Sequence, residues 1–415
     1  MSPKQLSSSM ATKPKEIFLA LFGNDDSTCT AFYTGRSPIT YSPPRDVEPP
    51  LCGNMGCRKC GAEGVAIHAD CYAVFMLNCE SERAMDRIWV ASAWRDPWRR
   101  APELYLDDGS FTAPRPSTAE SIGIPELAKL PMEIIQHIRS YSLEAPYWRY
   151  CTVQDLAQRS TAPTAFQSFP LHEVSAWERG GEPLLAADTS QLPIVRVLVD
   201  SHGISKLERL PDWPEHVASL SDTRRVYVFI DERRVKDISM HFKFGHARIV
   251  EIRRGEGLQI WDTPAPPRQG LKKITTGYEL SGPIPDAILL RTIELSQVTG
   301  LTIFYAVGSV MSIHAHTAKA PLATKTYERF PGFTKQFVVG AYVPLAPNDR
   351  ILNLGIRGCK PALDRCSFLI RTKLVGDILV GAYHGKHTVD YTFGGSPPTT
   401  LVFSPTELNQ NVGFV

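Results

Sequence analysis

The second half of the chain is patterned as short apolar runs separated by turn residues. From about Leu192 onward, runs rich in Val, Ile and aromatic residues alternate with Gly, Pro, Asn and Asp, which is typical of β-strands. One run places its apolar side chains on two faces, with Val226, Val228 and Ile230 on one and Tyr227 and Phe229 on the other. No long helical pattern interrupts these runs. We therefore predict a mainly antiparallel all-β domain over residues 190–415, built as a sandwich, a barrel or a propeller-like fold.

Helical spacing is the dominant pattern between residues 70 and 160. Apolar residues recur at near-helical intervals at Tyr72, Phe75, Met76, Cys79, Met85 and Ile88, which predicts one or two helices. A further helix is predicted to start at Pro131, because proline suits the first helical position and Glu133 in the first turn suits the helix dipole. Three isoleucines then form an apolar stripe along that helix: Ile134, Ile135 and Ile138.

These patterns divide the chain into four regions of an α+β multidomain protein. Residues 1–50 are Ser-, Lys- and Pro-rich and are expected to be disordered. Residues 51–115 are expected to form a small Cys/His finger with a helix, and residues 120–165 a helical segment. The all-β domain follows. Its ending, "NQNVGFV", lacks the polar fraying usual at a terminus, and we therefore expect that this domain could be incomplete here.

Composition limits the classes of partner more than it identifies one. About 43% of the 415 residues are hydrophobic and 21% are charged, as in an ordinary globular protein. The net charge of +2 favours neither nucleic acid nor an anionic membrane as a partner. The segment 224–254 is more basic, and its charges alternate with apolar positions, which predicts a solvated sheet face. With no membrane-spanning run and no secretory signal, we expect a cytoplasmic or nuclear protein.

A cluster of cysteine and histidine residues predicts a structural zinc site. Cys57 and Cys60 form a CxxC pair, which supplies two ligands from one tight knuckle, and His68 and Cys71 follow at the same spacing. The second pair stands where the next helix should begin, as in a treble-clef finger, and the helix dipole favours a thiolate there. Cys52 is an alternative ligand, and in that set His68 would support the site from outside. Four ligands leave no open position, so the zinc would serve folding.

Two further groups have a functional and a purely structural interpretation. His314 and His316 stand at i and i+2 in a predicted strand, so that both rings face one way and could hold a metal or an oxyanion. Local hydrogen bonding is the favoured alternative for this pair. The tryptophans of "RIWVASAWRDPWRRAP" could form a cation–π surface or could lock the finger onto its neighbour, which we favour. No P-loop, GxGxxG or GxSxG motif is present, and we predict no catalytic site and no enzymatic activity.

The stretch "LPMEIIQHIRSYS" resembles the opening of an F-box, the helical motif that docks on the Skp adaptor of cullin-based ubiquitin ligases. The matching positions are Leu130, Pro131, Glu133, Ile134, Ile135 and Ile138. More broadly, the chain is similar to a family of uncharacterised fungal F-box-like proteins with an N-terminal Cys/His finger. The shared stretches include "CRKCG", "VAIHADCYAVF", "RIWVASAWRDPWRRAP", "SAWERG", "IHAHT" and "YVPLAPNDRILNLGIR".

The resemblance implies a non-catalytic adaptor as the first hypothesis for function. In it, Leu130, Pro131, Ile134, Ile135 and Ile138 dock a Skp-type adaptor protein, and the β domain recognises a protein to be ubiquitinated. In a weaker version the isoleucines are simply core residues. The alternative hypothesis is a ligand- or carbohydrate-binding β domain, because the runs in residues 350–381 have the strand–turn–strand rhythm of sugar-binding repeats.

Overall fold

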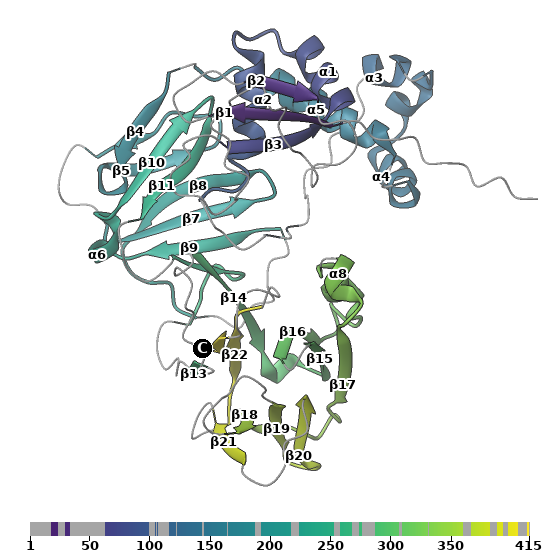
Figure 1. The fold of residues 1–415 in the computed structure, drawn as a ribbon, viewed down its shortest axis with the longest axis vertical. Helices are drawn as coiled ribbons and strands as arrows, with labels where there is room; N and C mark the ends of the chain where they lie inside the picture. Colours follow the sequence, from purple (N-terminus) through teal and green to yellow (C-terminus); the bar gives the residue numbers. More distant parts are fainter. Residues whose placement is uncertain are drawn as a thin grey trace, which may run out of the picture. The chain divides into compact units, whose positions relative to one another are not determined.

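The computed structural model falls into two compact units (Figure 1). It describes residues 18–23, 30–33, 63–98, 104, 106, 116–121, 123–142, 145–163, 165–186, 192–216, 224–252, 258–267, 274–275, 287–306, 309–330, 332–359, 367–381, 388–392, 397–405 and 413–414. Unit 1 comprises Met1–Ala93, Ser110–Phe166 and Lys243–His246. Unit 2 comprises Trp94–Gly109, Gln167–Phe242 and Ala247–Val415.

Unit 1 contains a three-stranded antiparallel sheet in the order β2-β1-β3. Its strands are β1 (Phe18–Gly23), β2 (Thr30–Tyr33) and β3 (Glu63–His68). Residues 1–50, expected to be disordered, thus contribute two strands, because the apolar run around Leu21 pairs with β3 and Leu21 is fully buried. β3 leads into α1 (Ala69–Asn78), which α2 (Ala84–Ala93) follows. These two helices confirm the helical spacing of this segment.

The rest of unit 1 is helical. It consists of α3 (Pro116–Ser121), the 3-10 helix η1 (Pro125–Lys129), α4 (Met132–Tyr141) and α5 (Pro146–Arg159). Pro131, predicted to be the first helical residue, is instead the N-cap of α4, which therefore begins one residue later, at Met132. Pro146 opens α5 in the first turn, where its missing N–H costs no helical hydrogen bond. α5 packs against α1, with the buried side chains of Cys71, Phe75, Trp148 and Cys151 belonging to these two helices.

Unit 2 is built almost entirely of strands, and the first of them starts at Gln167, ahead of the expected domain boundary at residue 190. Its first part comprises β4 (Gln167–Pro170), η2 (Leu171–Glu173), β5 (Val174–Glu178), β6 (Leu184–Leu185), β7 (Ile194–Asp200), β8 (Gly203–Leu210), β9 (Val226–Ile230), α6 (Glu232–Val235), β10 (Ile238–Lys243), β11 (His246–Ile252) and β12 (Leu258–Trp261). The three-stranded sheet β11-β10-β4 shares one apolar core with the large sheet that contains β9-β7-β8-β5.

Strand β9 lies inside the large sheet and is buried on both faces. Val226, Val228 and Ile230 face the core shared with β10 and β11, whereas Tyr227 and Phe229 join a second cluster with Trp261 on the opposite face. The two-faced arrangement predicted from the sequence is therefore confirmed. Burial on both faces explains why the run is continuously apolar rather than alternating with polar residues.

The remaining strands form a second β-rich part of unit 2. They are β13 (Ile274–Thr275), β14 (Ala287–Glu294), β15 (Gly300–Ala306), β16 (Ser309–His316), β17 (Val339–Pro344), β18 (Ile351–Cys359), β19 (Ser367–Thr372), β20 (Gly376–Gly381), β21 (Thr388–Thr392), β22 (Thr400–Phe403) and β23 (Gly413–Phe414), with η3 (Leu295–Gln297), α7 (Thr324–Glu328) and α8 (Gly332–Lys335) between them. The sheets β16-β15-β17 and β20-β19-β18-β21 share one core, as in a β-sandwich.

The strand pairs of the described residues are antiparallel, with one parallel exception, so the mainly antiparallel prediction holds. Leu258 of β12 pairs with Ala287 of β14 in parallel register. A parallel pair cannot be joined by a tight hairpin, and residues 262–286 separate these two strands in the sequence. No helix in the described part of the chain is long and apolar enough to cross a bilayer.

Candidate functional site

The candidate metal site begins where β3 passes into α1. His68 ends β3 and is the N-cap residue of α1, and Cys71 is buried in the first turn of that helix. This is the strand-to-helix placement that the sequence predicted for the second ligand pair. The other candidates, Cys52, Cys57 and Cys60, lie outside the described residues.

The ring of His68 is hydrogen bonded to helix α5. The Arg149 Nη1 atom lies 2.8 Å from His68 Nε2, and since a guanidinium only donates, Nε2 accepts. A neutral His68 then carries its proton on Nδ1, which leaves neither ring nitrogen open to a metal while this bond exists. The hydroxyl of Tyr150 also donates to Asp70 Oδ2 at 3.3 Å, so α5 holds the start of α1 at two points.

The donor set at this junction fits zinc through the cysteine thiol and less well through the histidine. Cys71 stands near the positive end of the α1 dipole, which favours a thiolate ligand. His68 would have to lose Arg149 to become a ligand. Within the described residues, no group of three or more His, Cys, Asp or Glu side chains is placed to hold a metal ion.

Helix α4 carries the residues that resemble an F-box opening, and the structure separates them into two sides. Ile135 is only 2% exposed and is a core residue, as the weaker version of the adaptor hypothesis expects. Leu130 and Ile138 are half-buried, whereas Pro131 and Ile134 are exposed. The five positions therefore do not form one surface.

The exposed side of α4 is a stripe formed by Ile134, His137 and Tyr141. These residues follow at i, i+3 and i+7, which places them on one face of a helix. Ile134 is 47% exposed and Tyr141 is 81% exposed, and the ring centroids of His137 and Tyr141 lie 5.0 Å apart. We call these three residues the α4 stripe. An apolar and aromatic stripe turned to solvent is the opposite of what a surface helix ordinarily shows.

The tryptophans of the segment 89–98 do not form a binding surface. Trp89, Trp94 and Trp98 are each about 1% exposed. Arg95 lies among them, and its Nε donates to the backbone oxygen of Ser201 at 2.9 Å. The packing interpretation of this segment therefore agrees with the structure, and a cation–π surface built on these rings does not.

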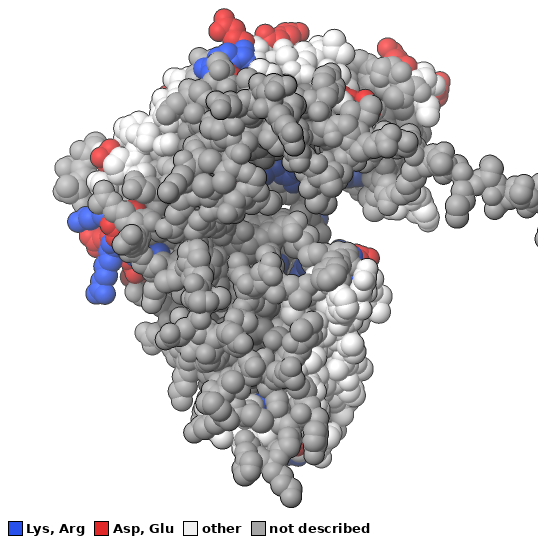
Figure 2. All heavy atoms as spheres, in the orientation of Figure 1, with Lys and Arg blue, Asp and Glu red and all other residues white. Residues whose placement is uncertain are grey.

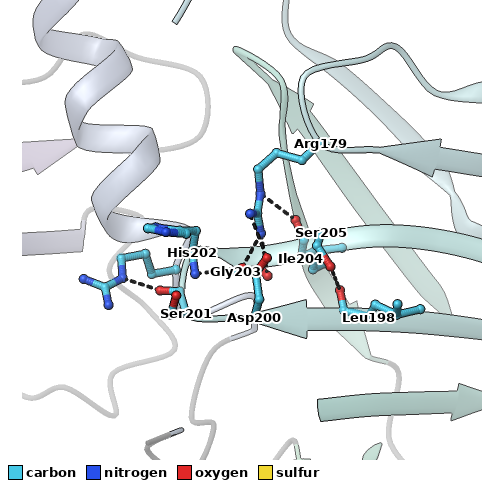
Figure 3. Close-up of polar contacts among 9 residues, drawn as sticks. Arg179, Leu198, Asp200, Ser201, His202, Gly203, Ile204 and Ser205 are labelled. Atoms are coloured by element: carbon cyan, nitrogen blue, oxygen red, sulfur yellow. Dashed lines mark hydrogen bonds and ion pairs between the residues drawn. The ribbon is translucent and has the colours of Figure 1, made fainter. Parts of the chain in front are cut away.

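Arg179, at the end of β5, holds the turn between β7 and β8 (Figure 3). Its two terminal nitrogens donate to the two oxygens of Asp200 at 2.9 and 2.7 Å. Further bonds reach the backbone oxygens of Gly203 and Ile204 at 2.9 and 3.2 Å. Asp200 Oδ1 also accepts from the backbone N–H of His202 at 2.8 Å.

This network gives a structural role to two residues of the segment "SAWERG", Trp177 and Arg179. Trp177 Nε1 donates to the backbone oxygen of Gly181, which closes the turn after β5, and Arg179 is then aimed at Asp200. Guanidinium and carboxylate thus satisfy each other within the fold. We read the network as a structural one that sequence reasoning missed, since Arg179 and Asp200 are 21 positions apart.

His314 and His316 lie on the same face of β16, with ring centroids 4.7 Å apart. All four ring nitrogens are hydrogen bonded to threonine hydroxyls or to backbone carbonyls. In the described part of the chain, no carboxylate hydrogen bonds to either ring. The structure thus shows local hydrogen bonding for this pair, and no described residue adds the carboxylate partner that a hydrolytic site would use.

The basic segment 224–254 is not simply a solvated face. Lys243 and Arg248 are 3% and 2% exposed. Lys243 lies with its amine 5.6 Å from the ring centre of Phe244 at the tip of the β10–β11 hairpin. At the top and the left edge of Figure 2, blue and red atoms of described residues lie next to each other, so these regions are of mixed charge.

The strands that suggested sugar binding use their charged side chains on one another. Arg357 of β18 makes two bonds to Asp390 of β21, at 2.6 and 2.7 Å. Arg371 of β19 pairs in the same way with Asp377 of β20. The carbohydrate-binding alternative gains no support from these residues, because their polar groups are already engaged across the sheet.

No protein-family model, curated protein or solved structure shows a significant match to this chain. The resemblance to F-box-like proteins therefore rests on the quoted stretches of sequence alone. The function has to be argued from the surfaces described above.

Proposed function

We propose that this chain is a non-catalytic interaction protein and that helix α4 is its docking element. One observation carries the proposal: the α4 stripe turns Ile134 and Tyr141 to solvent on a helix that is anchored from its other side by Ile135. Residues of this kind, set on a rigid helix, are the type that bury into a partner's groove. The resemblance to an F-box makes a Skp-type adaptor protein the partner of choice.

The docking face in this proposal is smaller than the resemblance alone implies. Ile134 and Pro131 supply exposed apolar surface at the start of the helix, and Tyr141 is its last residue. Ile135 contributes indirectly, since its burial fixes which side of α4 faces outward. The proposed face is therefore Pro131 together with the α4 stripe.

A structural zinc ion is part of the same proposal. Cys57, Cys60 and Cys71 would bind it, with His68 or Cys52 as the fourth ligand. Zinc would supply no chemistry beyond holding the chain before β3 against the start of α1. The β-rich unit 2 would then recognise the protein to be ubiquitinated, and the whole chain would act as an F-box-like substrate receptor.

Binding of the full chain to a purified Skp-type adaptor tests the proposal. Ile134→Asp should weaken binding by about 30-fold or more, because burying a carboxylate at a central contact costs on the order of 2 kcal/mol. Leu77→Asp is the matched control, since Leu77 of α1 is 85% exposed in the same unit and lies outside the proposed face.

Two results would count against the adaptor role. One is the absence of adaptor binding by the unmodified chain at tens of micromolar concentration. The other is equal binding by Ile134→Asp and Leu77→Asp. Replacing Ile135 would be uninformative about docking, because a charge at this buried position disrupts the core.

A further inference from the structure

His314 holds the chain that follows strand β16. Its Nε2 lies 3.2 Å from the backbone oxygen of Ala320, and its Nδ1 lies 2.9 Å from the hydroxyl oxygen of Thr326. A carbonyl can only accept, so the proton of a neutral His314 is on Nε2 and Nδ1 accepts from Thr326. One neutral ring thereby fixes two points of the segment 317–330.

His316 holds the same segment with the opposite tautomer. Its Nδ1 lies 2.9 Å from the backbone oxygen of Pro321, so that Nδ1 carries the proton. Its Nε2 lies 2.7 Å from the Thr302 hydroxyl on the neighbouring strand β15 and accepts from it. The edge-on ring of Tyr342 on β17 lies 4.8 Å away. Both histidines thus complete their hydrogen bonds as neutral imidazoles.

The segment held in this way covers apolar side chains on the face of β15 and β16 that carries the histidines. Phe330 packs against Phe304 of β15, with ring centroids 5.3 Å apart, and Met311 of β16 belongs to the same buried cluster. All three side chains are less than 9% exposed. Their burial depends on residues 317–330 staying in place.

A positive charge on the ring of His314 is unfavourable in this environment. His314 is 8% exposed, and burial lowers the pKa of its imidazole below the ordinary value of 6.5. The hydrogen bond to Ala320 opposes that shift, while His316 and Arg329 lower the pKa further. Among the residues that the structure describes, the charged groups that act on the pKa of His314 are a second imidazole and a guanidinium, and His316 faces the ring of Tyr342.

We propose that His314 is the acid-sensitive element of a latch, completed by the hydrogen bonds of His316, which holds residues 317–330 over β15 and β16 while the His314 ring is neutral and releases them when that ring is protonated. A charged His314 has no anion among its hydrogen-bond partners to offset its burial. Release uncovers the cluster of Phe304, Met311 and Phe330. The latch is independent of the adaptor proposal.

The direction of the pH dependence follows from the lowered pKa of His314. The folded state binds this proton more weakly than the unfolded segment does. The stability that the latch contributes is therefore fully present above about pH 6.5 and is lost as the pH falls through the window below it.

Amide hydrogen exchange of the full chain, read by mass spectrometry, tests the latch. The chain is labelled at pH 7.5 and at pH 5.0, with labelling times scaled to the intrinsic exchange rate at each pH. Peptides from 317–330 should exchange at least tenfold faster in acid, whereas peptides from β7 and β9 should keep their protection. An unchanged 317–330 region, or simultaneous loss of protection in β7 and β9, would overturn the proposal.

A glutamine variant separates the latch from a general acid effect. His314→Gln keeps an amide that can donate to Ala320 but does not titrate, so the acid response of 317–330 should fall at least fivefold. His172→Gln, which replaces an exposed histidine of η2, should retain the full response. Retention of the full response by His314→Gln would refute the latch. If circular dichroism shows that this variant does not fold at pH 7.5, His314→Asn, which also lacks a titrating ring, replaces it under the same criteria.

Discussion

The guanidinium carbon of Arg87 lies 4.5 Å from the centre of the Phe244 ring, and both side chains are buried. Phe244 and Gly245 connect β10 to β11 with φ angles of 50° and 72°, as the two central residues of a type I′ turn do. Asparagine is the usual first residue of such a turn, and a phenylalanine there costs about 1–3 kcal/mol of backbone strain. The ring contacts with Arg87 and Lys243 therefore offset a local penalty.

Replacing Phe244 shows which effect on stability is larger, the loss of the buried ring or the relief of backbone strain in the turn. Asn suits the positive φ, but it loses the buried ring, whose removal ordinarily costs about 3–5 kcal/mol. We expect Phe244→Asn to lower the free energy of unfolding by about 2 kcal/mol in urea denaturation. Tyr141→Asn, at an aromatic position that is 81% exposed, should change it by less than about 0.5 kcal/mol. A stabilising Phe244→Asn would show that turn strain outweighs the ring contacts.

Gly203, the first residue of β8, lies very close to the backbone of Trp94. Its φ is 96°, and a Cβ atom at this position would clash with the backbone oxygen of Trp94. Gly376, with a φ of 83°, has open space at the same point. Both glycines therefore adopt a positive φ that disfavours other residues, but only Gly203 also lacks room for a Cβ atom.

We expect Gly203→Ala to be clearly more destabilising than Gly376→Ala. Backbone strain alone should cost about 1 kcal/mol at either site, and the clash with Trp94 should add about 1–3 kcal/mol at Gly203. Thermal melting of the two variants in parallel gives the difference. Equal melting temperatures would contradict the close approach of Trp94 to this turn.

The sequence correctly predicted those elements whose signal lies within a few neighbouring residues. The alternation in β9 identified both of its faces, and the proline before α4 marked the helix start, because each signal lies within a few residues. Contacts between distant segments had no such signal. Arg95 and Ser201 are 106 positions apart, and only the fold brings the donor to the acceptor. The burial of Ile135 beside an exposed Ile134 was also inaccessible, since both fit the same motif.

Glu208 should make the β7–β8 hairpin sensitive to acid. Burial raises the pKa of this carboxyl, but its bonds to Lys206 and Arg196, at 2.8 and 2.6 Å, outweigh that effect and hold the pKa below 4.5. A lowered pKa means that the contributed stability is full above about pH 4.5 and is lost as the pH falls through the folded-state value.

The variant Glu208→Gln should therefore make the free energy of unfolding depend less on pH in the acidic range. We expect it to lower the free energy of unfolding by about 1 kcal/mol at pH 7 and by much less at pH 3, measured by urea denaturation at both pH values. Glu126→Gln, at an exposed position of η1, should follow the unmodified chain. An equal effect of Glu208→Gln at both pH values would exclude the charge as its cause.

The bond from Arg149 to His68 distinguishes the two zinc ligand sets. In the set Cys57, Cys60, His68 and Cys71, the metal competes with Arg149 for the ring nitrogen. When Cys52 replaces the histidine as a ligand, the bond from Arg149 survives and His68 only positions the start of α1. We predict that His68 keeps its bond to Arg149 when zinc is bound and that Cys52 is then the fourth ligand.

Zinc content of purified variants checks this preference. Cys71→Ser should lose the metal, with less than about 0.2 zinc per chain, because removing one of four ligands from a structural site abolishes tight binding. His68→Gln should retain about one zinc per chain and melt a few degrees lower, since it loses the contact with Arg149. Loss of zinc from His68→Gln together with retention in Cys52→Ser would reverse the assignment and make His68 the fourth ligand. The α1 variant Leu77→Ser, exposed and away from the junction, controls for the effect of a helix substitution on metal content.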